Sequence, residues 1–473
     1  MPEQFDVVII GGGPGGYAAA LYGASAGLSV GLVEKDKVGG TCLHRGCIPA
    51  KELLESAAVY RAVAGAAEFG IGTGTDTPSV DFSVTQRRKQ EVVDTEWKGL
   101  SGLLKARGVS TFEGTGTYKG GRKVRVHGGD ADGAELEGAA VILATGSAPR
   151  TIPGFEVDGR FVLTSDEFLA LDRLPERAAV IGGGAIGCEF ASTMSDLGVQ
   201  VTILEALPKI LPGLDGDVAN VVVRSFKKRG IEIRTGVQVT GHKPNDHGTS
   251  VQFGEGEAVD VDAVVVSVGR RPLSDTLGLD GTGVQVDERG FVVVDEYLRT
   301  GEDAVYAVGD LVTMGTGMHP QLAHVGFMEG MQAIKGILGE DQVPIDYGRV
   351  PWCIYCHPEV AFAGHSEESA KEAGLDVVTA KKHYRANGRA HILGETDGLV
   401  KVIAAKGADG RAGQILGVHM VGPWVTEQLG QGYLAVNWEA TVDEAAAFIQ
   451  PHPTLSEVFG ETVIALTGRS LHG

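Results

Sequence analysis

One short pattern occurs twice in this chain and constrains its fold more than any other feature. In each copy a strand-like apolar run is followed by Gly-x-Gly-x-x-Gly and then by a helix-like run. The glycines are Gly11, Gly13 and Gly16 in the first copy and Gly182, Gly184 and Gly187 in the second. Glycine permits a tight turn, close approach of a phosphate to the backbone, and close packing of helix on strand. One copy would be weak support, but two copies in this context predict two dinucleotide-binding βαβ units.

An acidic residue closes the second strand of each unit. Glu34 follows the apolar run 28–33, and Glu205 follows the run 199–204. A carboxylate in this position accepts hydrogen bonds from ribose hydroxyls. At the second unit Glu205 would accept from a free 2′-hydroxyl and would repel a 2′-phosphate, so NAD is favoured over NADP.

Further apolar runs that end in small or acidic residues are 139–146, 263–269 and 304–310. We expect each run to be a buried strand. The carboxyl ends of such strands face the ligand cleft in open α/β sheets, although any one of them could be a plain core strand.

Two cysteines, Cys42 and Cys47, stand close together in GGTCLHRGCIPAK (39–51). On one regular helix their Cα atoms would be roughly 8 to 9 Å apart. A relaxed disulfide needs about 4.4 to 6.8 Å, so a bridge here requires a distorted turn. A bridge over so short a loop stabilises the fold little, which favours a labile redox disulfide. From the spacing alone, two unlinked core cysteines remain an equal alternative.

Cys353 and Cys356 form another close pair, in VPWCIYCHPEVAF (350–362). We expect an extended strand here, in which residues three apart point to opposite faces and do not readily share a metal. We therefore interpret both as packing residues and predict no metal site. Cys188, on the helix after the second glycine turn, is expected to be a buried thiol.

Composition and charge bound the remaining possibilities. A chain of 473 residues predicts several domains. Its net charge of −20 disfavours nucleic acid and anionic membranes as partners. The uncharged stretch 7–33 has the length of a membrane span, but the glycine cluster breaks it, so we expect no membrane insertion. Five cysteines and an N-terminus without a positive region predict a cytoplasmic protein.

The two glycine turns, with the cysteine pair just after the first, resemble the FAD-dependent pyridine nucleotide-disulfide oxidoreductases. The resemblance runs from Phe5 to about Glu461. It implies an α/β fold with two Rossmann-like domains, for FAD and NAD, and an α+β C-terminal dimerisation domain. The implied limits are 1–149 for the FAD-binding domain, 150–275 for the NAD-binding domain, 276–346 for a central domain completing the FAD-binding region, and 347–473 for the interface domain.

The resemblance also implies contacts to the flavin. Glu34 and Asp310 would accept hydrogen bonds from the ribose-like parts of a tightly held FAD. Lys51 would lie beside the flavin and pair with Glu189, where its charge would stabilise a reduced flavin; an ordinary surface lysine is the alternative. His324 would cap the pyrimidine edge of the flavin, or be a plain helix residue. The other implied cofactor-binding residues are Gly116, Thr145, Gly146 and Gly269.

Near the C-terminus, HPTLSE (452–457) resembles the HPTxxE element of family members that oxidise dihydrolipoamide. An imidazole with a near-neutral pKa can take a proton from a thiol. A carboxylate on its other nitrogen fixes the tautomer and stabilises the imidazolium. His452 and Glu457 would fill these roles, although a His-Pro loop alone is usually structural. In the family this histidine acts in the active site of the partner subunit, which implies a homodimer.

The implied reaction is oxidation of protein-bound dihydrolipoamide to lipoamide through a Cys42–Cys47 disulfide and FAD, with hydride passed to NAD. Cys42 would exchange with the substrate and Cys47 would face the flavin. The implied partners are the lipoyl domains and acyltransferase core of a 2-oxo acid dehydrogenase or glycine-cleavage complex. An NAD-linked reductase of another low-molecular-weight disulfide is the alternative. The segment 311–320 is longer than expected for the family, and could reshape the approach to the flavin or be a surface insertion.

Overall fold

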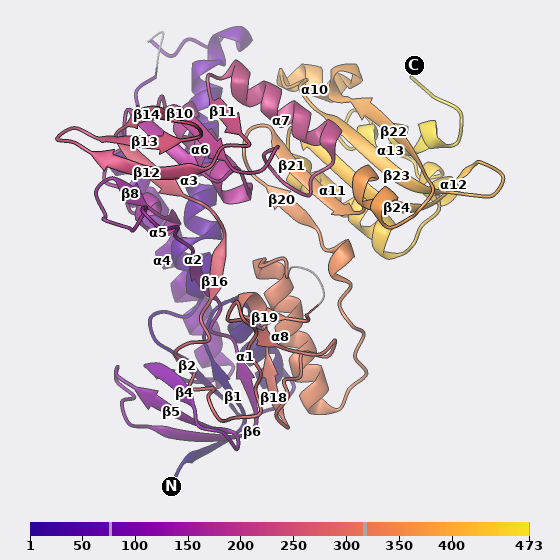
Figure 1. Ribbon diagram of the computed structural model, residues 1–473. Helices are drawn as coiled ribbons and strands as arrows, with labels where there is room; N and C mark the ends of the chain where they lie inside the picture. Colours follow the sequence, from indigo (N-terminus) through magenta and orange to yellow (C-terminus); the bar gives the residue numbers. More distant parts are fainter. Residues whose placement is uncertain (75–77, 316–318, 473) are drawn as a thin grey trace.

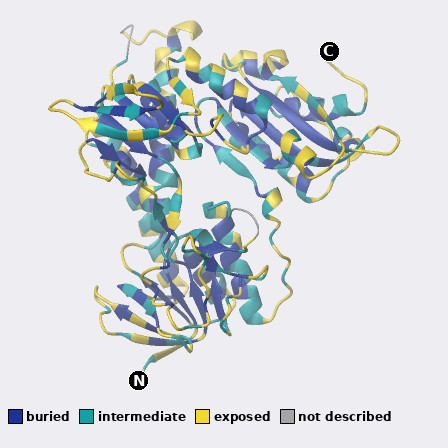
Figure 2. Cartoon of the chain, in the orientation of Figure 1, coloured by how far each residue is buried: buried dark blue, intermediate teal, exposed yellow. Residues whose placement is uncertain are grey.

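The computed structural model describes residues 1–74, 78–315 and 319–472. Figure 1 shows a lower lobe with the N-terminus, an upper left lobe, and an upper right lobe with the C-terminus. Figure 2 shows that buried residues concentrate in the sheets of these lobes, while loops and outer helix faces are exposed. The predicted fold class, two α/β dinucleotide-binding units and a C-terminal α+β unit, is confirmed. No helix among the described residues is long and apolar enough to cross a membrane.

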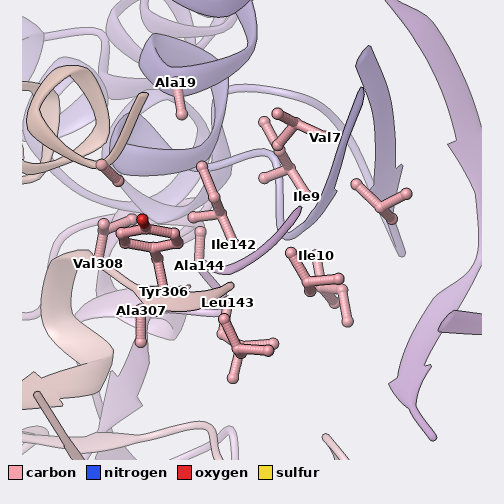
Figure 3. Close-up of a cluster of buried hydrophobic side chains, with 14 of the residues drawn as sticks. Val7, Ile9, Ile10, Ala19, Ile142, Leu143, Ala144, Tyr306, Ala307 and Val308 are labelled. Carbon is pink, nitrogen blue, oxygen red and sulfur yellow. The ribbon is translucent and has the colours of Figure 1, made fainter. Parts of the chain in front are cut away.

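The first sheet forms the core of the lower lobe. Its central strand, β1, is parallel to β2 on one side and to β6 on the other. Val7, Ile9 and Ile10 of β1 are buried in one cluster with Ile142 and Tyr306 from neighbouring strands, as Figure 3 shows. A parallel strand covered on both faces reads as an unbroken apolar run, as the sequence does here. The elements of this lobe are β1 (Glu3–Ile10), α1 (Pro14–Ser25), β2 (Val30–Glu34), β3 (Ser110–Glu113), β4 (Thr115–Tyr118), β5 (Lys123–His127), β6 (Glu135–Leu143), β17 (Val292–Val293), β18 (Val305–Ala307), η2 (Gly309–Leu311), β19 (Val312–Thr313) and α8 (Ala323–Leu338). The chain between β2 and β3 reaches the upper left lobe, where α3 packs against α6 (Figure 1); its elements are α2 (Gly40–Arg45), α3 (Cys47–Ala64), η1 (Ala66–Phe69) and α4 (Phe82–Ala106).

The second sheet, in the upper left lobe, repeats the order of the first four parallel strands of the first sheet, while its fifth strand comes from before the unit rather than from after it. Its parallel strands have the order β11-β10-β9-β15-β8, and the parallel strands of the first sheet have the order β3-β2-β1-β6-β18. Helix α6 joins β9 to β10 as α1 joins β1 to β2. In such sheets the ligand lies at the carboxyl ends of the strands. The elements of this lobe are β8 (Val162–Leu163), α5 (Ser165–Leu169), β9 (Arg177–Ile181), α6 (Ala185–Asp196), β10 (Gln200–Glu205), α7 (Gly216–Lys228), β11 (Glu232–Thr235), β12 (Val239–Pro244), β13 (Thr249–Phe253), β14 (Glu257–Val261) and β15 (Ala263–Val266).

The chain crosses between these two lobes through an antiparallel pair, β7 (Ser147–Pro149) and β16 (Arg270–Pro272). After β16 it returns to the first sheet, where β18 pairs with β6. The second dinucleotide unit is therefore inserted into the first. The limits near residues 150 and 275 lie close to this crossing and stay a prediction.

The third sheet, in the upper right lobe, is antiparallel with the order β20-β21-β24-β23-β22. Helix α11 packs against β21 and β24, and α13 packs against β22 and β23. The elements are η3 (Tyr347–Arg349), β20 (Trp352–Ile354), β21 (Glu359–Gly364), α9 (Glu367–Glu372), β22 (Val377–His383), η4 (Tyr384–Ala386), α10 (Gly388–Leu393), β23 (Leu399–Lys406), β24 (Ala412–Gly422), α11 (Val425–Asn437), α12 (Val442–Ala446) and α13 (Glu457–Leu466).

One local prediction is wrong. The segment around Cys353 and Cys356 is not a single strand, because β20 ends at Ile354 and the chain turns before β21 begins at Glu359. Cys353 is half-buried in the strand and Cys356 is buried in the turn. Cys188 is fully buried on α6, as predicted.

Candidate active site

The first glycine turn brings the end of β1 directly onto the start of α1. A methyl group at Gly16 would lie 1.8 Å from the carbonyl oxygen of Gly11, so only glycine allows this approach. Gly11 itself has a φ of +105°. Gly13 is the N-cap of α1 and supplies no capping side chain. The first amides of α1 are thus left free to donate to a phosphate, which is the donor set that a dinucleotide requires.

The second turn has the same geometry. A methyl group at Gly187 would lie 2.0 Å from the carbonyl oxygen of Gly182, and the N-cap Gly184 supplies no capping side chain. The hydroxyl of Ser267, which follows β15 beside this turn, is buried without a hydrogen-bond partner. An orphaned hydroxyl at a strand end and free helix amides both fit a polar ligand.

The predicted acidic residues occupy equivalent places in the two units. Glu34 accepts the amide of Gly12 at 2.7 Å, and Glu205 accepts the amide of Gly183 at 2.6 Å. The second oxygen of each carboxylate accepts one more backbone amide, at 2.9 Å for Glu34 and 2.7 Å for Glu205. A carboxylate has about four acceptor positions, so each retains capacity for ribose hydroxyls.

Other predicted flavin contacts gather at the strand ends of the first sheet. The Thr145 hydroxyl donates to the carbonyl of Leu273 at 2.7 Å, and Gly146 follows with a φ of +68°. The Asp310 carboxylate accepts from the Ser147 hydroxyl and lies 3.5 Å from Nε of Arg270. The return of β18 to the first sheet brings Asp310 to this edge.

The remaining predicted cofactor residues have other neighbours. Gly116 is buried in β4, where a methyl group would lie 2.8 Å from Cγ2 of Ile10, so packing explains it. His324 lies in the first turn of α8, and its Nε2 is 2.9 Å from the carbonyl oxygen of Pro351. Gly269 has a φ of +106° with open space beside its Cα.

The cysteine pair spans a break between two helices. Cys42 lies in α2 and Cys47 begins α3, and Gly46 between them has φ −145° and ψ −112°. The pair is therefore not on one regular helix, and the distorted turn predicted from the spacing is confirmed. The thiol of Cys42 hydrogen-bonds the sulfur of Cys47.

This hydrogen bond makes the two sulfurs unequal. Donation from Cys42 lowers the pKa of Cys47 to about 7; burial opposes the shift and the charge of Lys51 supports it. The pKa of Cys42 is raised, because its proton is held by Cys47 and the site is buried. In the reduced pair Cys47 is thus the thiolate, and a thiol of low pKa is the better leaving group in disulfide exchange.

A cation is held next to Cys47. Nζ of Lys51 lies 3.0 and 2.9 Å from the two carboxylate oxygens of Glu189, and 4.8 Å from the ring centroid of Tyr355. The amide of Tyr355 donates to the same carboxylate at 2.9 Å. Burial is the largest single influence on the pKa of Lys51 and would lower it, but the charge and hydrogen bonds of Glu189, together with Cys47 and Tyr355, outweigh burial and raise the pKa. Lys51 therefore stays charged at neutral pH, and the alternative of an ordinary surface lysine is wrong.

His452 is oriented but lies apart from the cysteines of its own chain. Its Nδ1 is 2.8 Å from Glu457, whose other oxygen accepts the amide of Thr454 at 2.8 Å. The side chain of His452 is 77% exposed, which leaves Nε2 accessible. In Figure 1 helix α13, which begins at Glu457, lies in the upper right lobe, whereas α2 lies at the left between the other lobes.

Two aspects of the site were not anticipated from the sequence. Arg270 fixes Ser147 by donating to its hydroxyl at 2.7 Å and to its carbonyl oxygen at 2.8 Å. Glu329 accepts the amide of Gly309, next to Asp310, at 2.5 Å. No local sequence pattern indicates either contact. Arg270 and Ser147 lie far apart in the chain, and Glu329 stands in a helix with an ordinary amphipathic sequence.

Two dinucleotide-binding units and a close cysteine pair are typical of flavin- and nucleotide-dependent disulfide oxidoreductases. Comparison with known proteins places the chain in the same class. The family model described as pyridine nucleotide-disulphide oxidoreductase matches residues 5–330, and that of its dimerisation domain matches residues 350–463. The chain belongs to the pyridine nucleotide-disulphide oxidoreductase family.

Particular relatives are similar over their whole length. Dihydrolipoyl dehydrogenase of Bacillus subtilis is 41% identical, with 100% of each chain covered. That of Haloferax volcanii is 39% identical, with 99% of this chain and 97% of the relative covered. Among solved structures, LpdA of Mycobacterium tuberculosis has a TM-score of 0.90 at 27% identity, covering 98% of this chain and 99% of that one. The HOCl-induced flavoprotein disulfide reductase RclA of Escherichia coli has a TM-score of 0.85 at 27% identity, covering 97% and 99%.

Proposed function

We propose that the protein is a dihydrolipoyl dehydrogenase, which oxidises protein-bound dihydrolipoamide and passes the electrons to NAD. The observation that carries the proposal is the cysteine pair on the two sides of the break between α2 and α3, with the Lys51–Glu189 ion pair one helical turn after Cys47. The glycine turns before α1 and α6 leave helix amides free to bind phosphate, so each turn can bind one dinucleotide, a flavin at the first and a nicotinamide dinucleotide at the second.

In the proposed reaction His452 of the partner subunit takes a proton from one thiol of dihydrolipoamide. The substrate thiolate attacks Cys42, the Cys42–Cys47 bond breaks, and Cys47 leaves as a thiolate. The second substrate thiol then attacks the substrate sulfur bound to Cys42, which forms the ring of lipoamide; the S–Cys42 bond breaks and the proton of this thiol passes to the released Cys42 sulfur. At the first unit Glu34 and Asp310 would hold the ribose-like parts of FAD, which would supply an acceptor for the two electrons of the reduced cysteines and a hydride donor for NAD. The positive charge of Lys51 would stabilise the negative charge of a reduced flavin beside it.

The cofactor, assembly and location follow from the same features. Family membership supports FAD and a nicotinamide dinucleotide, and Glu205 favours NAD. The dimerisation domain and the separation of His452 from Cys42 in one chain support a homodimer. Lipoyl domains and the acyltransferase core of a 2-oxo acid dehydrogenase or glycine-cleavage complex are the proposed partners, and the cytoplasm is the proposed location.

A second candidate is an NAD-linked reductase of another disulfide, favoured by the similarity to RclA. Anaerobic titration of the flavin-loaded protein separates the two. Dihydrolipoamide should produce a thiolate-to-flavin charge-transfer band at stoichiometric concentration, while reduced glutathione should not. A band formed by glutathione but not by dihydrolipoamide would refute the proposal in favour of the second candidate.

A further inference from the structure

A buried carboxylate lies close to the first dinucleotide site and has no part in the proposed reaction. Glu329 of α8 has an exposure of 0%. Within the described ranges no lysine or arginine forms an ion pair with it. Instead it accepts the amide of Gly309 at 2.5 Å, Nε2–H of His319 at 2.7 Å and the hydroxyl of Tyr347 at 2.6 Å. A buried charge is tolerated only when its acceptor positions are satisfied in this way.

The donors come from separate parts of the chain. Gly309 follows β18, His319 belongs to the long segment 311–320, and Tyr347 begins the third lobe. The parts of that segment at 316–318 lie outside the described residues. We call Glu329, His319 and Tyr347 the Glu329 cluster.

Each donor in the Glu329 cluster is held in its donating state. Nδ1 of His319 accepts the amide of Gln321 at 3.1 Å, so the hydrogen-bond network assigns the imidazole proton to Nε2. The rings of His319 and Tyr347 are in contact, with centroids 5.5 Å apart. Burial and the charge of Glu329 raise the pKa of Tyr347, which keeps its hydroxyl protonated.

The carboxylate acts on the backbone at the point where the sheet ends. The amide of Val308 donates to Leu143 at 3.0 Å, in line with the ladder between β18 and β6. Gly309 then turns away with a φ of +77°, and Glu329 takes its amide. The next residue is Asp310, so Glu329 sets the turn that aims the Asp310 carboxylate.

The same helix also touches the phosphate-binding end of α1. A methyl group at Gly330 would lie 2.3 Å from the carbonyl oxygen of Gly15, and one at Gly326 would lie 3.3 Å from the amide nitrogen of Gly15. A shift of α8 would therefore disturb both the Gly309–Asp310 turn and the first turn of α1.

We propose that the Glu329 cluster is a positioning device for the dinucleotide of the first unit, and that His319 ties the chain just before α8 to it. This inference rests on the proposed function only in taking FAD as the occupant of that unit. It gives His319 and Tyr347 a role in FAD retention.

The test compares Glu329→Gln, His319→Gln and Tyr347→Phe in the flavin-loaded enzyme, with Glu340→Gln, an exposed residue just after α8, as the control. FAD release is followed by flavin fluorescence after dilution, and the setting of the bound flavin by visible circular dichroism. We expect Glu329→Gln to speed release about tenfold, and the other two about threefold, from the loss of one hydrogen bond to a charged group. NAD affinity should stay unchanged.

Release rates and flavin spectra equal to those of Glu340→Gln would overturn the inference, even if only His319→Gln and Tyr347→Phe yield folded protein. Equal losses of NAD affinity and FAD retention would also overturn it, because they indicate general destabilisation. Absence of flavin from the unmodified protein would refute the proposed function, and the inference with it.

Discussion

The two glycine-turn units of this chain share their local geometry. In both, a glutamate at the end of the second strand accepts the amide that follows the first glycine, at 2.7 Å for Glu34 and 2.6 Å for Glu205. In both, the N-cap of the helix is a glycine without a capping side chain. The same local sequence therefore builds the same phosphate-binding end twice.

Their surroundings differ. At the first unit a methyl group at Gly40 of α2 would lie 2.6 Å from Cα of Gly13, and α8 closes on Gly15 from another side. At the second unit Ile186, in the first turn of α6, is 37% exposed. The first glycine turn is thus packed against the backbone of two further helices, α2 and α8, whereas the second is packed against the segment at Ile210 and Leu211.

The largest effect is expected from a change in the cysteine pair, which should remove the disulfide chemistry beside the first unit and leave the reaction with NADH at the second unit intact. Cys47→Ser removes the leaving thiolate, so NAD reduction by dihydrolipoamide should fall about a thousandfold or more. Flavin binding and oxidation of NADH by an artificial electron acceptor should persist, since they need no disulfide. Cys353→Ser is the control and should keep full activity. Intact lipoamide-dependent turnover in Cys47→Ser would contradict the relay.

The second largest effect is expected from a change at His452, which lies outside both dinucleotide-binding units. His452→Gln removes the proposed base and should lower turnover about a hundredfold, with flavin retained. His472 offers a matched control, because its Nδ1 also lies 2.8 Å from a glutamate, Glu461, on the same lobe. If His452→Gln and His472→Gln have the same steady-state rates, the base assignment is wrong.

A matched pair of N-cap variants tests the assignment of the two units directly. Added methyl groups at Gly13 and Gly184 meet no protein atom within 4 Å, and neither φ is strained, so Gly13→Ala and Gly184→Ala should both fold. Each methyl would instead approach the phosphate of its own ligand. We expect about tenfold weaker FAD binding in Gly13→Ala and an about tenfold higher KM for NAD in Gly184→Ala. Reversed effects would mean that the two sites have been exchanged.

The nucleotide preference of the second unit should change less. Glu205→Gln keeps the shape of the side chain but removes the charge that would repel a 2′-phosphate. The ratio of kcat/KM for NAD over NADP should drop about fivefold, by loss of one charge-assisted hydrogen bond. The corresponding Glu34→Gln should leave this ratio unchanged. A preference of the unmodified protein for NADP would refute the argument.

The smallest effect concerns the pH range of the thiolate. The pKa of Cys47 is lowered from its ordinary value to about 7, so the charge-transfer band should be present above about pH 7 and fade below it. Removing the charge in Lys51→Gln should raise this pKa by about one unit, which moves the fading to higher pH. The exposed Lys35→Gln serves as the control. A midpoint that does not move in Lys51→Gln would show that Lys51 does not stabilise the thiolate.

Much of this architecture could be predicted from the sequence. Short motifs predict the features that depend on neighbours in the chain, namely the glycine turns, the glutamates at strand ends and the break in the cysteine segment. Helix starts are less well defined by the sequence: α1 begins at Pro14 and α6 at Ala185, each before the last glycine of its turn, because glycine-rich stretches blur helix boundaries. The pair Cys353 and Cys356 misled because a β-branched and aromatic run reads as a strand even where the chain turns.

Contacts between distant parts of the chain could not be predicted from local sequence, and Lys51 and Glu189 are an example. Without the family resemblance, nothing local joins two side chains 138 positions apart, and their ion pair exists because α3 packs against α6. Glu329 is a sharper case, since it stands in an ordinary amphipathic helix and its donors come from three other segments.

The sequence alone thus determined the features that short-range sterics encode: two phosphate-binding turns, an acidic residue for each, and two cysteines close together beside a glycine. The tertiary structure determined which cysteine has the lowered pKa, which lysine lies beside it, and which helices pack against each turn. These properties depend on burial and on charges brought together from distant segments, and a linear pattern does not record either.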